Sequence, residues 1–329
     1  MVTIVSMEHY ALGQSTLQVS PVGLGCWQFS RREGMAGRYW AKLSQVTVRD
    51  IVRASLEHGV NWFDTAEVYG NGASERSLAE ALDELDVDRA RYAIADKWFA
   101  AFRFAGSIAR TLPDREAALG GRHIDLHQIH QPFSFSSIDR QAAAMAELQK
   151  QGRIAAVGVS NFNEKKMRTA HARLTAEGVV LASNQMPYSL IDQGIERNGV
   201  LEAAKALDIS IIAYSPLAQG ILTGKFHNGV DVRQSAGPRK YFKRFKSRGL
   251  EATRPLIELL TQIGRTHDAT PAQVALAWTF QRHGTHVVAI PGAGSVGQAA
   301  SNADALNVRL STTELEELAA AGAAAEAKL

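Results

Sequence analysis

Four residues of complementary chemistry stand near the ends of short apolar runs in this sequence. Asp64, Lys97 and His130 each end such a run, and Tyr69 follows five residues after Asp64. A lysine cation near a phenol favours phenolate and lowers the phenol pKa, and an aspartate beside the lysine fixes and balances its charge. A tyrosine activated in this way suits general acid catalysis, the protonation of a carbonyl oxygen as a hydride reaches the carbonyl carbon.

Each of these residues also has a plainer interpretation. One charged group at a strand end is often part of a salt bridge at the rim of a sheet. A tyrosine is more often a packing residue, with an apolar body and a polar tip, than a catalyst. Asp, Lys and His at three successive strand ends weaken these alternatives, because their side chains would point at one shared opening.

The elements that position these residues follow from a regular alternation of apolar runs and amphipathic stretches. Near-continuous apolar runs are typical of parallel strands covered by helices. The predicted strands are Val22–Phe29, Asn61–Ala66, Tyr92–Lys97, Leu126–Gln131, Ala156–Asn161, Ala182–Pro187, Ile211–Pro216 and Val287–Gly292. The predicted helices include Thr47–His58, Ala73–Leu85, Ile138–Gln151 and Arg197–Leu207. Thr270 before Pro271, and Ser311 three residues before Glu314, are typical signals of two further helix starts.

Eight strands, each followed by helical sequence, predict a single (β/α)₈ barrel domain over residues 1–329. The polar residues at the strand ends recur about 25 to 33 residues apart, the length of one strand–helix unit. Such barrels place their chemistry at these ends. Long loops are expected after the first strand, Phe29 to Thr47, and after the seventh, Leu217 to about Leu250. A doubly wound sheet is excluded, since the first strand lacks the third glycine of a phosphate-binding turn.

Composition limits the class of protein. The 329 residues carry a net charge of +3 and are 46% hydrophobic, as in ordinary soluble proteins. The single cysteine, Cys26, excludes an intrachain disulfide and suits a reducing compartment. No run is long enough to span a membrane, and Met1 to Tyr10 has no targeting pattern, so we expect a cytoplasmic protein. The histidines show no spaced metal-ligand set, and no metal is expected.

Several motifs, in this order along the chain, carry a resemblance to a known family. They are Asn61-Trp62-Phe63-Asp64-Thr65-Ala66-Glu67-Val68-Tyr69-Gly70, Gln128-Ile129-His130-Gln131-Pro132, Gly158-Val159-Ser160-Asn161-Phe162, Asn184-Gln185, Tyr188-Ser189-Leu190, Tyr214-Ser215-Pro216-Leu217, Leu222-Thr223-Gly224-Lys225 and Ile290-Pro291-Gly292-Ala293. With them, the sequence resembles the aldo-keto reductase superfamily from Gly13 to about Leu318. The stretch from Lys97 to Ser107 is similar to a subgroup that includes plant and cyanobacterial pyridoxal reductases.

The resemblance implies a catalytic tetrad and a nicotinamide cofactor. Tyr69 would be the general acid, Lys97 with Asp64 its activating pair, and His130 would orient the carbonyl. Ser160, Asn161 and Gln185 would hold the carboxamide, with Tyr214 stacked on the nicotinamide ring. The remaining cofactor residues implied are Ser215, Pro216, Leu217, Gly220, Leu222 and Lys225 along the pyrophosphate, and Gly292, Ser295, Gln298 and Asn302 at the adenosine end. Asn161 and Gln185 could also cap the helices that follow them.

Two departures from the family pattern affect specificity. No Lys or Arg occurs between Ile290 and Val308, where many related sequences have one that pairs with the 2′-phosphate of NADP. Gln131 follows His130 where an aromatic residue is frequent, which would open or polarise the substrate pocket.

The segment Lys225–Arg248 offers a substitute for the missing cation. It carries eight Lys or Arg residues and one acid, Asp231. A mobile cationic loop above the mouth suits closure over the phosphates of a dinucleotide, so we expect NADP(H) to be preferred and NAD(H) to be possible. The alternative is a solvated loop that keeps the protein soluble.

The substrate pocket is expected to be lined by Trp27, Phe29, Trp98 and Phe133, beside Tyr69. These aromatic walls favour an apolar or aromatic small-molecule carbonyl substrate. The expected function is NAD(P)H-dependent reduction of aldehydes or ketones to alcohols. A cofactor-binding regulatory subunit with little turnover is the alternative on the same fold. No nucleic-acid or membrane partner is expected, and the sequence predicts no oligomeric state.

Overall fold

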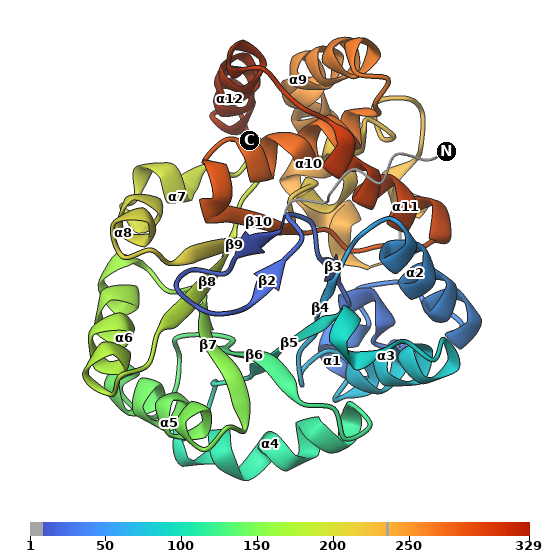
Figure 1. The fold of residues 1–329 in the computed structure, drawn as a ribbon. Coiled ribbons are helices and arrows are strands. Elements are labelled where there is room, and N and C mark those ends of the chain that lie inside the picture. Colours follow the sequence, from blue (N-terminus) through green and yellow to red (C-terminus); the bar gives the residue numbers. More distant parts are fainter. Residues whose placement is uncertain (1–8, 235–236) are drawn as a thin grey trace, which may run out of the picture.

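The computed structural model describes residues 9–234 and 237–329. Eight parallel strands form a barrel with helices around its outside (Figure 1). They follow one another in chain order as β3 (Leu24–Gly25), β4 (Trp62–Asp64), β5 (Ala93–Trp98), β6 (Ile124–Ile129), β7 (Ile154–Ser160), β8 (Leu181–Pro187), β9 (Ser210–Tyr214) and β10 (Val287–Ile290). Parallel bridges from Val22 to Ala289 and from Gly25 to Gly292 bring the last strand back to the first. The predicted (β/α)₈ barrel is confirmed. The first eight residues, where no targeting segment is expected, and 235–236 of the basic loop lie outside the described residues.

Helices follow the strands along the chain, and those that the amphipathic patterns predict are found close to the expected positions. They are α2 (Gln45–Glu57), α3 (Ala73–Glu84), α4 (Gly106–Ala118), α5 (Ile138–Lys150), α6 (Glu164–Ala176), α7 (Gly194–Arg197), α8 (Val200–Ala206), α9 (Ser247–Thr266), α10 (Pro271–Gln281), α11 (Val296–Asp304) and α12 (Thr312–Glu326). The two predicted helix starts are confirmed, since Thr270 and Ser311 both form capping boxes. Each cap satisfies backbone N–H groups that the helix itself leaves without partners.

Six of the predicted strands end one to four residues earlier than expected, and one predicted helix is divided. Three of these differences have a clear local reason. The first strand stops after Gly25, because the chain turns into a 3-10 helix over Trp27–Phe29. The seventh predicted strand stops at Tyr214, because Ser215 has a φ of +54° and cannot continue a strand. The predicted helix Arg197–Leu207 is divided into α7 and α8 by Gly199, whose φ is +81°.

The two predicted long loops are present, and both contain short helical turns. The first holds α1 (Gly34–Gly37) between β3 and α2. The second, between β9 and α9, holds 3-10 helices over Ala218–Thr223, Val232–Gln234, Pro238–Tyr241 and Lys243–Phe245. The Cβ that a side chain at Gly237 would add lies 2.0 Å from the carbonyl oxygen of Tyr39. The two loops therefore touch at a point where only glycine fits.

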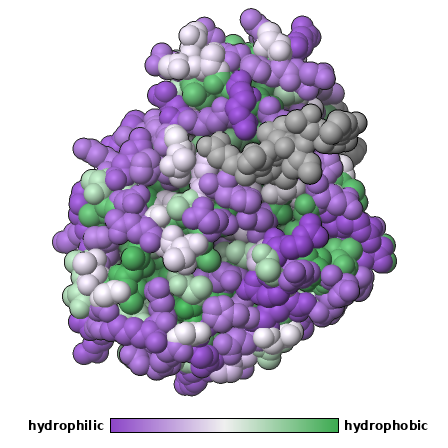
Figure 2. All heavy atoms as spheres, viewed as in Figure 1, coloured by the Kyte–Doolittle hydropathy of each residue, from purple (hydrophilic) through white to green (hydrophobic). Residues whose placement is uncertain are grey.

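The amino-terminal end of the barrel is closed by a small hairpin, β1 (Tyr10–Ala11) and β2 (Gln18–Val19), which lies in front of the barrel in Figure 1. Tyr10, Leu12 and Val19 pack on the apolar side chains inside the barrel, such as Trp62. The surface on this side is mostly hydrophilic (Figure 2). The opposite end, where the strands finish, is left for the polar residues. No helix in the described part of the chain is long and apolar enough to cross a membrane.

Two carboxyl groups are buried between the barrel and its helices. Strand alternation turns Lys97 into the barrel and Asp96 outward, so both are fully buried on opposite faces of β5. Glu75 of α3 is also fully buried and pairs with Arg115 of α4 at 2.9 Å. Neither oxygen of the Asp96 carboxyl has a hydrogen-bond partner in the described structure. Burial raises the pKa of both carboxyl groups well above their ordinary range.

We expect Asp96→Asn to stabilise the protein at pH 8 but not at pH 5. A carboxyl whose pKa is raised by folding binds a proton more readily in the folded state, so its stability contribution is lost as the pH rises. An amide cannot ionise, and the gain at pH 8 should be roughly 1–3 kcal/mol, the scale of one unsatisfied buried polar group. Thermal unfolding of both proteins at the two pH values measures this.

Asp125→Asn is the matched control for that change. The Asp125 carboxylate accepts from the Ile94 backbone N–H and pairs with Arg89, so its loss should destabilise the protein. An Asp96→Asn protein that is less stable than the wild type at pH 8 would contradict the interpretation.

Candidate active site

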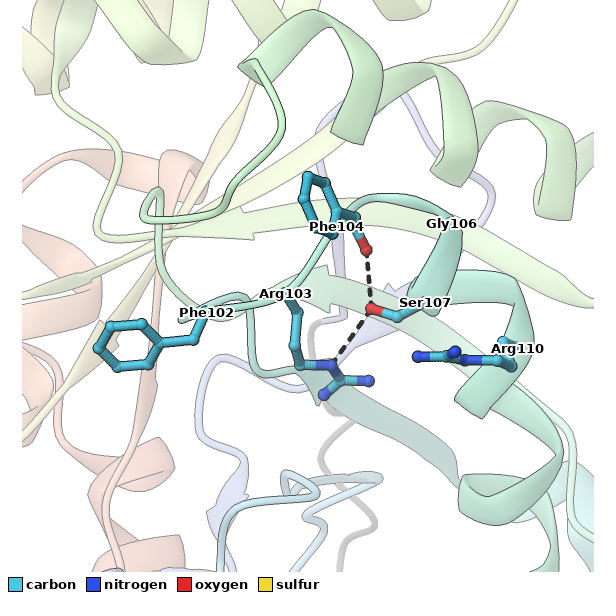
Figure 3. Close-up of a pocket in the computed structure, with 6 residues that line it drawn as sticks. All are labelled: Phe102, Arg103, Phe104, Gly106, Ser107 and Arg110. Carbon is cyan, nitrogen blue, oxygen red and sulfur yellow. Dashed lines mark hydrogen bonds between the residues drawn. The ribbon is translucent and has the colours of Figure 1, made fainter.

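An open hollow of about 320 Å³ lies at the start of α4 (Figure 3). It is lined by Phe102, Arg103, Phe104, Gly106, Ser107 and Arg110. None of the four candidate catalytic side chains lines this hollow. Those side chains come instead from the ends of β4, β5 and β6 and the loop after β4, inside the rim of the barrel.

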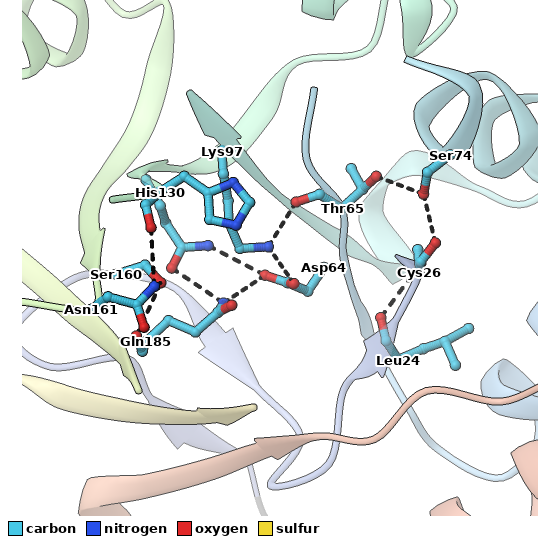
Figure 4. Close-up of polar contacts among 11 residues, drawn as sticks. Leu24, Cys26, Asp64, Thr65, Ser74, Lys97, His130, Ser160, Asn161 and Gln185 are labelled. Atoms are coloured by element: carbon cyan, nitrogen blue, oxygen red, sulfur yellow. Dashed lines mark hydrogen bonds and ion pairs between the residues drawn. The ribbon is translucent and has the colours of Figure 1, made fainter. Parts of the chain in front are cut away.

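A buried ion pair lies at the centre of this group (Figure 4). The Lys97 ammonium donates to Asp64 Oδ1 at 2.5 Å and to the Thr65 carbonyl at 2.8 Å. Lys97 is 0% exposed and Asp64 is 1% exposed. Burial by itself lowers the pKa of Lys97 and is the largest single influence. The charge and hydrogen bond of Asp64, together with Tyr69 and Asp96, outweigh it, and the net pKa is raised. Lys97 is therefore a fixed cation at neutral pH.

The second oxygen of Asp64 is held by two amides. Gln185 Nε2 donates to Asp64 Oδ2 at 2.8 Å, and Gln128 Nε2 lies 3.3 Å from the same atom. Such hydrogen bonds hold the carboxylate in place beneath the lysine. Gln128 was not predicted as a site residue. The sequence does contain the information to predict it. Gln128 lies two residues before His130, and side chains two residues apart on a strand point to the same face.

Tyr69 lies against the lysine. Lys97 Nζ is 5.1 Å from the centre of the Tyr69 ring. The sequence predicts a lowered phenol pKa, but the net direction here is the opposite. Burial raises the pKa of Tyr69, and the nearby Lys97 cation offsets only part of this effect. In this structure Tyr69 is thus a neutral phenol, which still has the proton that a general acid must give.

His130, the first residue after β6, faces the same tyrosine. The His130 and Tyr69 ring centres are 5.7 Å apart and nearly perpendicular. Burial, helped by the Lys97 charge, lowers the pKa of His130 to about 3. The imidazole is therefore neutral at physiological pH, when it has one N–H to donate and no charge.

The residues expected to hold a carboxamide form one hydrogen-bonded group. Asn161 Nδ2 donates to Ser160 Oγ at 3.0 Å and to the His130 carbonyl at 3.2 Å. Tyr214 donates its hydroxyl to Asn161 Oδ1 at 3.0 Å, and Ser160 donates to the Gln185 carbonyl. The capping alternative is wrong for Asn161, because α6 is capped by Asn163. Asn161 instead has a φ of +62°, an unusual conformation for a residue that is not glycine.

The expected pyrophosphate residues follow β9. Ser215 and Gly220 both have positive φ angles, so the chain winds tightly over this end of the barrel. Leu222 and Pro216 are buried, and Leu217 is partly buried against the core. The Lys225 ammonium lies 5.0 Å from the Phe226 ring centre and close to Gly220. A side chain at Gly220 would bring its Cβ to 3.4 Å from Lys225 Nζ.

The expected adenosine residues gather at the start of α11. Ser295 caps this helix by accepting from the Gln298 N–H, and Gln298 in turn accepts from the Gly294 N–H. Asn302 donates to the Gly292 carbonyl at 3.3 Å. Ser295 and Gln298 are exposed, so their polar groups can reach a ligand at this helix start.

An aromatic stack connects Tyr69 to the two long loops. Trp27 stacks on Tyr69 with 5.7 Å between ring centres, and it packs at a tilt against Tyr39 with 4.7 Å between ring centres. Tyr39 donates its hydroxyl to Gln219 Oε1 at 2.8 Å, on the opposite loop. Arg239 lies 5.0 Å from the Trp40 ring and is only 9% exposed. Sequence reasoning missed Tyr39, Trp40 and Gln219, since nothing local shows that two loops distant in sequence meet.

Two of the four expected substrate residues are misplaced. Phe29 and Trp98 are each 1% exposed and belong to the hydrophobic core outside the barrel. Trp98 follows Lys97 on β5, so alternation turns it away from the mouth, and its indole donates to Ser107 Oγ. Trp27 lies at the mouth, and Phe133 is 64% exposed on the loop after β6.

Comparison with known proteins agrees with this architecture. Residues 21–323 match the Aldo/keto reductase family. An uncharacterised oxidoreductase of Mycobacterium bovis is 39% identical, covering 92% of this chain and 88% of that protein. A chloroplastic pyridoxal reductase of Arabidopsis thaliana is 31% identical over 92% of this chain and 83% of its own length, in keeping with the expected subgroup.

A solved structure shows the same likeness in three dimensions. An aldo-keto reductase from Klebsiella pneumoniae in complex with NADPH superimposes with a TM-score of 0.72 and 25% identity, over 94% of each chain. The barrel fold, the residues at the strand ends and the sequence match all indicate the same family. The chain therefore belongs to the aldo/keto reductase family of oxidoreductases.

Proposed function

We propose that this chain is an NADPH-dependent reductase that converts small aldehydes or ketones to alcohols. The observation that carries the proposal is the buried Lys97–Asp64 pair lying against the Tyr69 ring, with the neutral His130 facing that ring. This arrangement offers a proton donor, a cation behind it and a neutral hydrogen-bond donor at one place. Residues 1–329 act as one domain in this proposal, and the unpaired, buried Cys26 suits the reducing cytoplasm.

Each residue has a distinct part in the reaction. A bound reduced nicotinamide would supply a hydride to the carbonyl carbon. Tyr69 gives its phenolic proton to the carbonyl oxygen, so that the product is a neutral alcohol. Lys97 stabilises the negative charge left on the Tyr69 oxygen, and Asp64 balances the lysine. His130 donates its N–H to the same carbonyl oxygen and orients it.

The polar groups present fit a nicotinamide dinucleotide. Amide and hydroxyl groups of Ser160, Asn161 and Gln185 can both donate to and accept from a carboxamide. Tyr214, fixed by its bond to Asn161, offers an aromatic face to a planar ring. The start of α11, with the exposed Ser295, is suited to a phosphate. Lys225 and the basic loop would neutralise the remaining phosphate charge.

We expect NADPH to bind more tightly than NADH, through the basic loop. Changing Arg239 and Lys240 together to glutamine should weaken NADPH on the order of tenfold or more and NADH much less, since a hydrogen bond to a charged group is worth about 1.5–3 kcal/mol. Quenching of tryptophan fluorescence during titration with each cofactor measures both affinities.

The control for this pair is Lys243→Gln with Lys246→Gln, two exposed cations of the same loop. It makes the same change in net charge and should leave the ratio of the two affinities unchanged. Equal losses for both cofactors in the Arg239 and Lys240 variant, or a wild-type preference for NADH, would leave the loop as a solvated surface.

The proposed substrates are apolar or aromatic carbonyl compounds. Trp27 and the exposed Phe133 provide aromatic surface near the mouth, and Lys166 lies 5.4 Å from the Phe133 ring. Oxidation of NADPH in the presence of a panel of aldehydes, from short aliphatic to aromatic, tests this. Tight binding of NADPH with no turnover of any aldehyde would favour a regulatory subunit instead.

A further inference from the structure

Glu67 lies two residues before Tyr69, and its side chain leaves the Tyr69 loop for the next loop. Glu67 Oε1 accepts from the Phe99 backbone N–H at 2.5 Å and from Arg103 Nη1. Its side chain is 13% exposed and that of Arg103 is 24% exposed. This ion pair is partly shielded from water, and it joins the loop after β4 to the loop after β5.

Arg103 is held from several sides. Nη1 also donates to the Phe99 carbonyl at 3.2 Å, and Nη2 donates to Thr111 Oγ1 at 2.8 Å. Nε donates to Ser107 Oγ at 3.2 Å, a contact drawn in Figure 3. The guanidinium carbon lies 5.3 Å from the Trp98 ring centre. A planar group with this many partners has one position, and so does the carboxylate that it holds.

A third loop, the one after His130, is attached to the same arginine. The Arg103 carbonyl accepts from the Phe135 N–H at 2.9 Å and from Ser134 Oγ at 2.7 Å. The Phe99 ring, whose backbone Glu67 holds, packs edge-on against His130 with 5.9 Å between ring centres. The ion pair thus lies where the loops that follow β4, β5 and β6 meet, and those strands and loops carry Tyr69, Lys97 and His130.

We propose that the Glu67–Arg103 ion pair is a positioning device for the reaction, which fixes Tyr69 relative to His130. Neither residue is placed to touch the substrate carbonyl. They act through the Tyr69 loop on one side and through Phe99 on the other. This inference rests on the proposed function, because it assigns the pair to the proton transfer from Tyr69. A misplacement of about 1 Å between reacting groups can lower the rate about 100-fold. An ion pair that fixes Tyr69 relative to His130 therefore has a large effect on the rate.

The test is the rate of NADPH oxidation in a single turnover, with excess aldehyde and enzyme already loaded with NADPH. Glu67→Gln keeps an oxygen for the Phe99 N–H but loses the charge that holds Arg103. We expect its rate to fall by about 10- to 100-fold. The affinity for NADPH should stay within about twofold, and the pH at which the rate is half-maximal should not move, because the change alters geometry and not the charge beside the phenol.

A second variant, Arg103→Lys, should have an intermediate rate. It also tests the positioning role if Glu67→Gln does not fold. Lysine keeps the charge but lacks the planar fork, so its rate should fall less than that of Glu67→Gln but stay clearly below the wild type. The matched control is Glu116→Gln, which breaks another carboxylate–guanidinium pair, that of Glu116 with Arg153. It should lower the melting temperature and leave the rate unchanged.

Several outcomes would overturn the positioning role. One is a Glu67→Gln protein that loses stability as Glu116→Gln does but reduces aldehyde at the wild-type rate. A pH profile displaced from that of the wild type would mean that Glu67 acts by charge and not by position. A wild-type rate in Arg103→Lys would also overturn it. If Tyr69→Phe is fully active, the proposed function itself fails; if Tyr69→Phe is inactive and Glu67→Gln is normal, only this inference fails.

Discussion

Replacing Tyr69 by phenylalanine should lower the rate of aldehyde reduction at least about 100-fold, the lower end for a positioned general acid. The change removes the proton donor and leaves the ring, which packs between Trp27 and His130. The fold and the affinity for NADPH should survive. Single-turnover rates, together with fluorescence titration of NADPH, separate the loss of chemistry from a loss of binding.

Tyr39→Phe is the matched control for this prediction. Tyr39 also packs against Trp27, and the change also removes one hydroxyl, but this hydroxyl donates to Gln219 on the other long loop. Its effect on the chemical step should be small, and any effect should fall on cofactor binding. A Tyr69→Phe enzyme that reduces aldehydes at a near-normal rate would remove Tyr69 from the role of acid.

For Tyr69, the sequence predicts the neighbours of the side chain but not the direction of its pKa shift. The types and spacing of Asp64, Tyr69 and Lys97 predict that they meet, and they do. The direction of the pKa shift was wrong, because it depends on how much of the ring is buried as well as on the lysine. Burial comes from Trp27 and the loops above it, and their packing is a long-range property that no local motif carries.

The geometry of β-strands explains both the correct prediction of the strands and the wrong prediction of Trp98 as a substrate residue. Apolar runs located all eight strands, because each run must be buried on both faces in a parallel sheet. The same period of two decides which side chains enter the barrel. Lys97 and Trp98 are neighbours, so they point in opposite directions, and only one of them can serve the mouth. If this alternation is applied to each strand residue in turn, it excludes Trp98 from the substrate pocket and includes Gln128 among the site residues.

Contacts between loops were beyond prediction for a different reason. Glu67 lies inside the most recognisable motif of the chain, but its partner Arg103 lies 36 residues later, in a loop without periodicity. The contact between Gly237 and Tyr39 joins the loops after β9 and β3, which are also distant in sequence. Such contacts depend on the final path of the loops, which the barrel restricts at its ends but does not determine along its length.

Replacing Lys97 by methionine should abolish reduction and also destabilise the fold. Without the ammonium, Asp64 keeps a buried negative charge with only the amides of Gln185 and Gln128 beside it. Removing one partner of a buried ion pair costs about 3–5 kcal/mol, because the other charge is left without compensation. The loss should be larger at pH 8 than at pH 5, since at lower pH the stranded carboxyl can take up a proton.

A double variant separates the two effects of the lysine. Changing Asp64 to asparagine in the Lys97→Met protein removes the stranded charge and keeps a side chain of similar shape. Stability should then recover in large part, while activity should not, because no cation remains to stabilise the charge on the Tyr69 oxygen. Thermal unfolding at the two pH values and single-turnover rates measure the two quantities independently. An active Lys97→Met enzyme, or a double variant that regains activity along with stability, would show that the lysine serves the fold alone, and the proton transfer would then need a different source of charge at the barrel mouth.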